Sequence, residues 1–212
     1  MLFSRVVIFF EGQTEEQALP IWAHEYWGAS IHELGFTFVR VNGTDYFPFI
    51  WLAKSLQIPW FIMADGEPQP VSKLDESLKK AGCDSSAKLA NVVVLPGGSN
   101  FESHLINSGY LTEVEAAMNE LSGNTTALDA FIEKNHGLPY PKNKGNRDYK
   151  SEGGRERAAK DAMAAAKTRL AKPIARAISG LQDDARRFPP AIRMLFDIIA
   201  RDQGLPQRPS DN

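Results

Sequence analysis

The sequence predicts an α/β protein with a parallel four-stranded sheet flanked by helices, followed by a C-terminal helical extension. Short unbroken apolar runs, typical of strands buried on both faces of a sheet, occur four times in the first 95 residues. Segments with helical periodicity separate these runs, and such alternation favours a parallel sheet with right-handed crossovers. We expect residues 1–110 to form the sheet domain, residues 111–202 the helical extension, and residues 203–212 a disordered tail.

The composition indicates a globular protein outside the secretory pathway. A chain of 212 residues with 43% hydrophobic residues can bury a full core, in one domain with an appendage or in two small domains. The single cysteine, Cys83, allows no intramolecular disulfide, so we expect a cytoplasmic location. The sequence has no signal-peptide pattern and no apolar stretch near the roughly 20 residues of a membrane span, so no membrane partner is expected.

Charge is distributed unevenly along the chain. Residues 1–133 contain 7 basic and 17 acidic residues, whereas residues 134–212 contain 17 basic and 9 acidic residues. This asymmetry fits simple charge balancing between the two halves. It fits equally well a metal-holding carboxylate cluster beside a surface that binds a polyanion.

The first predicted strand, Val6–Phe10, is followed directly by a carboxylate, Glu11. Gly12 allows a tight turn there, so Glu11 and Glu15 should lie together at the carboxyl end of the strand, where open α/β sheets bind ligands. Acidic residues are favoured in any first helical turn, which gives Glu15 a purely structural interpretation as well. A carboxylate that ends a buried strand is costly to desolvate without a partner, and this favours a functional role for Glu11.

The helix after this turn is expected over residues 15–27, because apolar residues recur there at the spacing of one helical face. Thr14 and Gln17 have the spacing of a capping box that would open it. Pro20 should distort the helix or shift its start.

The remaining predicted elements of the sheet domain alternate in the same way. Asn42-Gly43 is expected to form a turn, Ser72 to cap a helix that ends before Gly82, and residues 96–100 to form a turn. The predicted strands are 36–41, 60–64 and 92–95, and the predicted helices are 46–56 and 72–81.

Carboxylates follow three of the four predicted strands. The third strand ends in Asp65-Gly66-Glu67, and Glu102 follows the turn after the fourth strand. With Glu11 and Glu15, these side chains should converge at one edge of the sheet, with no basic residue in the same turns. Gathered carboxylates raise each other's pKa or recruit a cation, and oxygen ligands favour Mg²⁺, Mn²⁺ or Ca²⁺ over zinc. The four histidines lack zinc-site spacing.

These motifs resemble a known family. A strand ending in Glu-Gly-x-Thr-Glu, with a later strand ending in two acidic residues separated by one, resembles the Toprim domain of topoisomerases, primases and related nucleases, over residues 6–68. The segments EGQTEEQALP (11–20), ADGE (64–67), NFESHLI (100–106) and Lys172-Pro173 are similar to the overcoming lysogenization defect (OLD) family nucleases. Glu67 departs from the aspartate that is usual in the second motif, and its longer side chain reaches a different point.

The resemblance implies a Toprim-like, Rossmann-like fold and an endonuclease that cuts DNA with two divalent ions, Mg²⁺ or Mn²⁺, with Ca²⁺ as a non-productive or structural ion. It implies metal binding by Glu11, Glu15 and Asp65, with Glu67 and Glu102 as further or outer ligands. Family members carry an ATPase domain before this region. The chain has no Gly-x-x-x-x-Gly-Lys-Ser/Thr loop, so it is expected to be the nuclease portion alone or a truncated product, with the ATPase domain of the full-length protein as its partner.

Beyond residue 110 the sequence predicts helices. Thr112 and Glu115 have capping-box spacing, and a short helix is expected over Ala127–Asn135. A long basic helix over Arg155–Ile178 should be kinked at Pro173, and an amphipathic helix should contain Ile192 to Ile199.

Two basic features in this region are candidates for contact with nucleic acid. Residues 136–154 are rich in Gly, Pro, Asn and Lys, and predict either a solvated linker or a basic flap. The candidate phosphate contacts of the flap and the adjacent helix are Lys142, Lys144, Arg147, Lys150 and Arg155. Lys172 aligns with a lysine that the family uses at its active site, so the resemblance implies a catalytic role. Its ordinary interpretation is a solvated helix face.

Two other functions remain open at this point. Carboxylates at strand ends also serve metal-dependent phosphomonoesterases, although the first motif offers no aspartyl nucleophile. A non-catalytic module that binds a nucleic acid or a nucleotide would have the same charge pattern.

Overall fold

A computed structural model describes residues 4–141 and 145–207 of the chain. Its centre is a parallel sheet in the order β2-β1-β3-β4, formed by β1 (Val6–Phe10), β2 (Phe36–Arg40), β3 (Trp60–Ala64) and β4 (Val92–Val94). The register pairs Ile8 with Phe38 on one side and with Phe61 on the other. The predicted α/β fold class and its parallel four-stranded sheet are confirmed.

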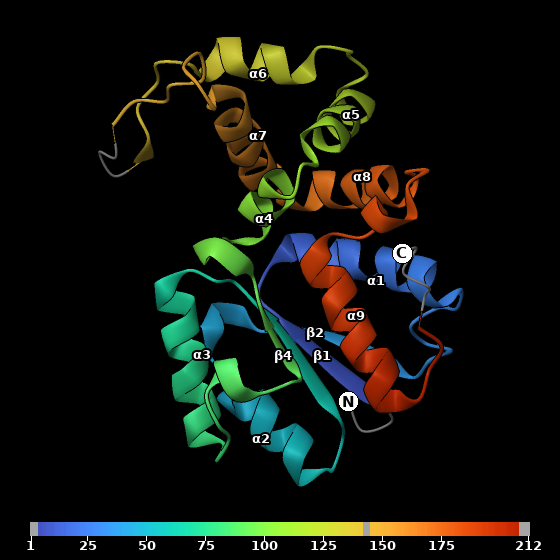
Figure 1. Ribbon diagram of the computed structural model, residues 1–212. Helices are drawn as coiled ribbons and strands as arrows, with labels where there is room; N and C mark the ends of the chain where they lie inside the picture. The colour runs from blue at the N-terminus through green and yellow to red at the C-terminus, as the bar shows by residue number, and fades with distance from the viewer. Residues whose placement is uncertain (1–3, 142–144, 208–212) are drawn as a thin grey trace.

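Helices cover both faces of the sheet (Figure 1). One face packs against α2 (Phe47–Ser55) and α3 (Pro68–Lys80), and the other against α1 (Gln13–Trp27) and α9 (Pro190–Gln203). Side chains of β1 alternate between the two cores: Ile8 points toward α1, and Phe9 points toward α2. All five residues of β1 are buried, which explains why its sequence is an unbroken apolar run rather than an alternating one.

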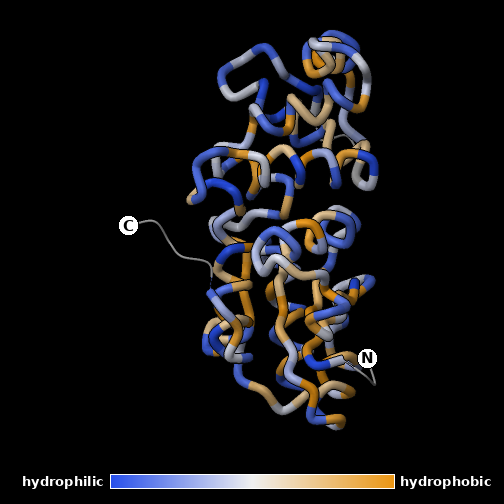
Figure 2. The backbone as a smooth tube through the Cα atoms, turned by 90° about the vertical axis from the view of Figure 1, so that its right-hand side faces the viewer, coloured by the Kyte–Doolittle hydropathy of each residue, from blue (hydrophilic) through white to orange (hydrophobic). Residues whose placement is uncertain are grey.

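The remaining helices lie beyond the carboxyl ends of the strands (Figure 1). They are α4 (Phe101–Asn107), α5 (Leu111–Ser122), α6 (Ala127–Asn135), α7 (Gly154–Ala165) and α8 (Lys167–Ser179). In Figure 2 the apolar residues concentrate in the half of the molecule that holds the sheet. Helix α8 packs against both α1 and α5, so it joins the sheet half to this helical half. The last helix, α9, returns to the sheet and packs on β3 and β4, although it lies in the part of the sequence assigned to the extension.

Several predicted boundaries are wrong, and each has a local cause. Helix α1 begins at Gln13 with Gly12 as its N-cap, so Thr14 and Gln17 form no capping box, and Pro20 lies inside the helix. Helix α3 begins at Pro68, because proline is well suited to a first helical position, and Ser72 is an interior residue.

The predicted helix over Arg155–Ile178 is two helices. The chain breaks at Ala166, where φ is −118° and ψ is 21°, and not at Pro173, which lies inside α8. In the fifth helix, Tyr110 occupies the N-cap position, so the predicted capping box of Thr112 and Glu115 is absent. Predicted strands 36–41 and 92–95 are each one residue shorter, whereas Ala127–Asn135 matches α6.

Candidate metal centre

Glu11 leaves β1 at its carboxyl end and is held there by two hydrogen bonds. The buried Tyr46 hydroxyl, just before α2, donates to Glu11 Oε1 at 3.1 Å, and the backbone N–H of Asp65 also donates to the carboxylate. Partial burial nevertheless raises the pKa of Glu11 above its usual value, and the nearby charge of Glu67 adds to this effect. The end of β1 therefore presents a carboxylate in a fixed orientation.

Glu15 is the third residue of α1, and only 4% of its surface is exposed. The Gly12 N–H donates to Glu15 Oε1 at 3.2 Å, which folds the carboxylate back over the turn. A Cβ atom on Gly12 would lie 2.1 Å from Glu15 Oε2, so only glycine leaves room for this arrangement. The pKa of Glu15 is raised to about 8, mainly by burial and also by the charges of Asp65 and Glu102. Glu15 is thus a buried acid rather than an ordinary first-turn residue.

Asp65 follows β3 as Glu11 follows β1. Burial raises its pKa to about 7, and Glu11, Glu102 and Glu67 contribute to the shift by like-charge repulsion. The next residue, Gly66, donates its N–H to the Ser99 carbonyl at 2.8 Å. Its own Cβ would lie 1.9 Å from the Leu95 carbonyl oxygen, so only glycine allows this turn to pack against the turn after β4.

That second turn positions Glu102 in the first turn of α4. Asn100 caps this helix, because its side chain accepts the Ser103 N–H at 2.9 Å. The buried Thr14 hydroxyl donates to Glu102 Oε1 at 3.2 Å, which links α4 to the start of α1. Glu67 is the exposed N-cap residue of α3, and its negative charge contributes to the raised pKa values of Glu11 and Asp65.

The five predicted carboxylates are therefore neighbours at one edge of the sheet, as the mutual effects on their pKa values indicate. Within the described residues, Lys73 is the one basic side chain among the main causes of these pKa shifts, and it lowers the pKa of Glu11 only weakly. The donors are all oxygens, the set that suits Mg²⁺, Mn²⁺ or Ca²⁺. In the described part of the chain, no three acidic, histidine or cysteine side chains stand close enough to form a complete metal-binding group.

Lys172 lies on the exposed surface of α8, in a groove between α8 and α1 with a volume of about 420 Å³. Glu16 and Gln17, from the first turns of α1, line the same groove. Lys172 therefore lies beside the first turns of α1, the helix that contains the buried Glu15.

Three of the five candidate phosphate contacts, Arg147, Lys150 and Arg155, have partners within the protein. Arg155 binds Glu115 and Asp129 with distances of 2.6 and 2.5 Å, and so fastens α7 to α5 and α6. The Lys150 ammonium lies 2.9 Å from Glu133, and Arg147 stacks on the Tyr140 ring, its guanidinium carbon 4.8 Å from the ring centroid. Lys142 and Lys144 lie outside the described residues.

Tyr46 and Thr14 were not predicted as part of the site. The sequence places Thr14 in a predicted capping box and in the Glu-Gly-x-Thr-Glu motif, and it places Tyr46 at the start of a predicted apolar helix, with no role at the site predicted for either side chain. Their hydroxyl groups are the feature of the sequence that could have indicated a role at the site. Only the tertiary structure shows that Thr14 and Tyr46 are both buried and donate hydrogen bonds to carboxylates.

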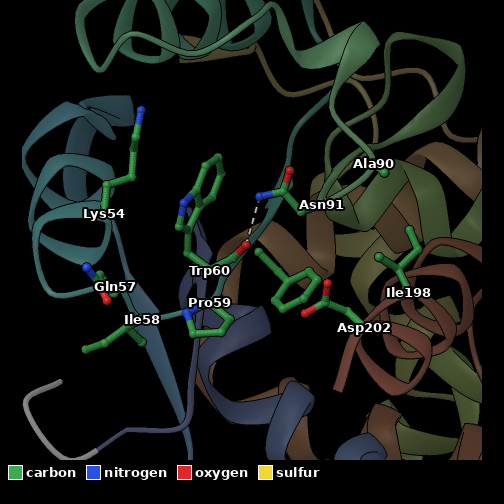
Figure 3. A pocket seen from close by; sticks show the side chains of 10 residues that line it. Lys54, Gln57, Ile58, Pro59, Trp60, Ala90, Asn91, Ile198 and Asp202 are labelled. Carbon is green, nitrogen blue, oxygen red and sulfur yellow. Dashed lines mark hydrogen bonds between the residues drawn. The ribbon is translucent and has the colours of Figure 1, made fainter. Parts of the chain in front are cut away.

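A cavity of about 590 Å³ lies at the opposite end of the sheet (Figure 3). It opens beside Trp60 at the start of β3, where the Asn91 side chain donates to the Trp60 carbonyl at 2.9 Å. Lys54 lies at its rim and donates to the Ala81 carbonyl at 2.7 Å. No predicted site residue lines this cavity, so it is separate from the carboxylate cluster.

The sequence and the fold both resemble those of known proteins. Residues 2–66 match the family model of the overcoming lysogenization defect protein-like TOPRIM domain. The C-terminal region of the Xanthomonas campestris pv. campestris OLD protein superposes with a TM-score of 0.63 at 21% identity, covering 96% of this chain and 98% of that one. The C-terminal region of the Burkholderia pseudomallei OLD protein gives a TM-score of 0.62 at 21% identity, covering 95% and 98%. No curated protein matches the sequence.

The family match spans both glycine turns that position the carboxylates, up to Gly66, and the structural matches span nearly the whole chain. Within the described residues, no helix is long and apolar enough to cross a bilayer. The resemblance drawn from the motifs is confirmed: residues 2–66 match the OLD-like Toprim domain, and the chain shares the fold of the C-terminal regions of OLD proteins.

Proposed function

We propose that this protein is a divalent-metal-dependent endonuclease that hydrolyses phosphodiester bonds of DNA. The observation that supports it most strongly is the burial of Glu15, with the partly buried Asp65 and Glu11 beside it at the carboxyl edge of a parallel sheet and the pKa values of Glu15 and Asp65 raised to about 8 and about 7. A protein that gathers carboxylates at this cost without cations close by is suited to bind a cation. The OLD-like Toprim match points to a nuclease or hydrolase at a coarse level.

We assign the metal ligands to Glu11, Glu15 and Asp65, with Glu67 and Glu102 as further or outer ligands. Because no three of these side chains stand close enough to hold an ion in the described structure, metal binding would have to draw them together. Two ions, Mg²⁺ or Mn²⁺, would supply an activated water and neutralise charge on the scissile phosphate, whereas Ca²⁺ would occupy the site without supporting cleavage. Because the ligands must be deprotonated, metal binding would release the protons that Glu15 and Asp65 hold near neutral pH.

The side chains around the ligands have separate roles. The Tyr46 hydroxyl donates to Glu11 Oε1 and would orient this carboxylate toward a metal ion, and the Thr14 hydroxyl would orient Glu102 in the same way. Lys172 would stabilise the charge that develops on the scissile phosphate, because it lies exposed beside the first turn of α1. We expect the chain to act in the cytoplasm together with an ATPase domain, as the OLD resemblance implies.

The test is incubation of the purified chain with supercoiled plasmid, in EDTA, Mg²⁺, Mn²⁺ or Ca²⁺. Nicking or linearisation in Mg²⁺ or Mn²⁺ without ATP, abolished by Asp65→Asn, supports the nuclease. Release of phosphate from a monoester with an intact plasmid would instead identify a phosphomonoesterase. DNA binding without any turnover would identify a non-catalytic module.

A further inference from the structure

The groove between α1 and α8 begins at Glu16, the residue after the buried Glu15, and contains charged residues of both signs. It has a volume of about 420 Å³, within the range of ligand sites, and its charged walls contain two acidic and two basic residues besides His24. Those residues are Glu16, Glu25, Lys172 and Arg176. Counted by residue type, the groove is neutral.

The acidic side chains of the groove already have basic partners outside it. Glu16 lies 3.2 Å from Arg40 at the end of β2, and Glu25 lies 3.4 Å from Arg187, which also lies 3.6 Å from Asp184. Neither Arg40 nor Arg187 lines the groove. Within the described residues, the side chains of Lys172 and Arg176 take part in no ion pair or hydrogen bond, and both are exposed. The groove therefore presents two basic side chains that are available to an anionic ligand.

The spacing of these charges suits a phosphate chain. Lys172 and Arg176 are four residues apart on α8, so they share one face at a separation of about 6 Å along the axis. The opposite wall is α1, and it contributes Glu16, the residue immediately after the buried Glu15. Pro20 and Ile21 give the floor an apolar surface between the charges.

We propose that this groove is a subsite for the DNA backbone: Arg176 binds the phosphate next to the scissile one. This rests on the proposed function, in which Lys172 acts at the scissile phosphate. The groove then sets the path of the cleaved strand, from the carboxylates along α1 toward His24. An arginine suits this role because its planar fork binds a phosphate through two parallel hydrogen bonds.

The test compares Arg176→Ala with Arg169→Ala in the full chain. Arg169 is an exposed arginine of the same helix that lines a different cavity, so it is a matched control for charge and helix stability. Binding of a fluorescent DNA duplex is measured by anisotropy in EDTA over a salt series. Arg176→Ala should weaken binding by about tenfold at low salt and reduce the logarithmic salt slope by about 0.9, the value for one lost phosphate contact. Arg169→Ala should leave the slope unchanged, and Arg176→Lys should restore it.

The outcomes separate the groove from the nuclease activity. Equal salt slopes for Arg176→Ala and the wild type would overturn the groove subsite even if the wild type cleaves plasmid. A reduced slope for Arg176→Ala in a protein that never cleaves would support the subsite and refute the nuclease. A wild type that neither binds nor cleaves DNA would overturn both.

Discussion

Replacing Glu15 by Gln tests whether burial of this carboxylate costs stability in the absence of metal. The amide keeps the shape of the side chain, and its oxygen can still accept the Gly12 N–H bond of 3.2 Å. The folded-state pKa is about 8, against a usual value of 4.5. Between these two values the unfolded chain loses its proton while the folded chain keeps it, so the free energy of unfolding of wild type falls as pH rises. Above about pH 8 the loss is complete, and below pH 4.5 it is absent.

The size of the effect follows from the same two values. One pKa unit corresponds to about 1.36 kcal/mol, so a shift from 4.5 to about 8 means that the ionised Glu15 lowers the free energy of unfolding at pH 9 by about 5 kcal/mol. For a chain of this length, that is about 10 to 20 °C in melting temperature. In EDTA, Glu15→Gln should therefore melt at least about 10 °C above wild type at pH 9 and within about 3 °C of it at pH 5.

Thermal melts at both pH values, with EDTA and with Mg²⁺, measure this. Glu16→Gln is the control, because it removes the carboxylate charge of the next residue in the sequence. The Glu16 side chain is 45% exposed and pairs with Arg40, and such exposed ion pairs contribute little to stability. Mg²⁺ should raise the melting temperature of wild type more than that of Glu15→Gln, since the variant lacks a ligand. If Glu15→Gln melts below wild type at both pH values and responds equally to Mg²⁺, Glu15 is a structural residue and the metal-site reasoning is wrong.

Three other substitutions address the site from different sides. Asp65→Asn should abolish cleavage and reduce the stabilisation by Mn²⁺ in thermal melts, while an unchanged Mn²⁺ response would remove Asp65 from the ligand set. Tyr46→Phe removes the 3.1 Å bond to Glu11 and should weaken Mg²⁺ binding, measured by calorimetry, by about tenfold; unchanged affinity would make Tyr46 a core residue only. Lys172→Ala should lower the cleavage rate about a hundredfold with nearly unchanged DNA affinity, and an equal loss in both would make it an ordinary phosphate contact.

The sequence predicted the structure best where burial of apolar side chains alone determines it. The apolar run Val6–Phe10 could only be a strand covered on both faces, and the carboxylates at strand ends follow from that topology. Sequence patterns could not locate Tyr46 against Glu11, because the contact joins residues 35 positions apart. The same holds for Thr14 and Glu102, which are 88 positions apart.

Helix ends were predicted less well, because several signals compete at each one. Ser72 is a good N-cap residue, but Pro68 starts α3 one turn earlier, at the turn that Gly66 forms against Leu95. At α1, the buried Glu15 carboxylate takes the Gly12 N–H, so the helix starts before the residue pair that resembled a capping box. In both cases the structure of the site determined where the helix begins.

The break between α7 and α8 shows how a wrong boundary bears on function. A proline inside a helix removes one backbone hydrogen bond, so a kink is expected at Pro173. The helix ends instead at Ala166, seven residues earlier, and α8 continues through Pro173 to Ser179. Lys172 and Arg176 therefore belong to one continuous helix, and both line the groove along α1. This continuity is a structural condition for the subsite, because one strand of DNA has to contact both side chains.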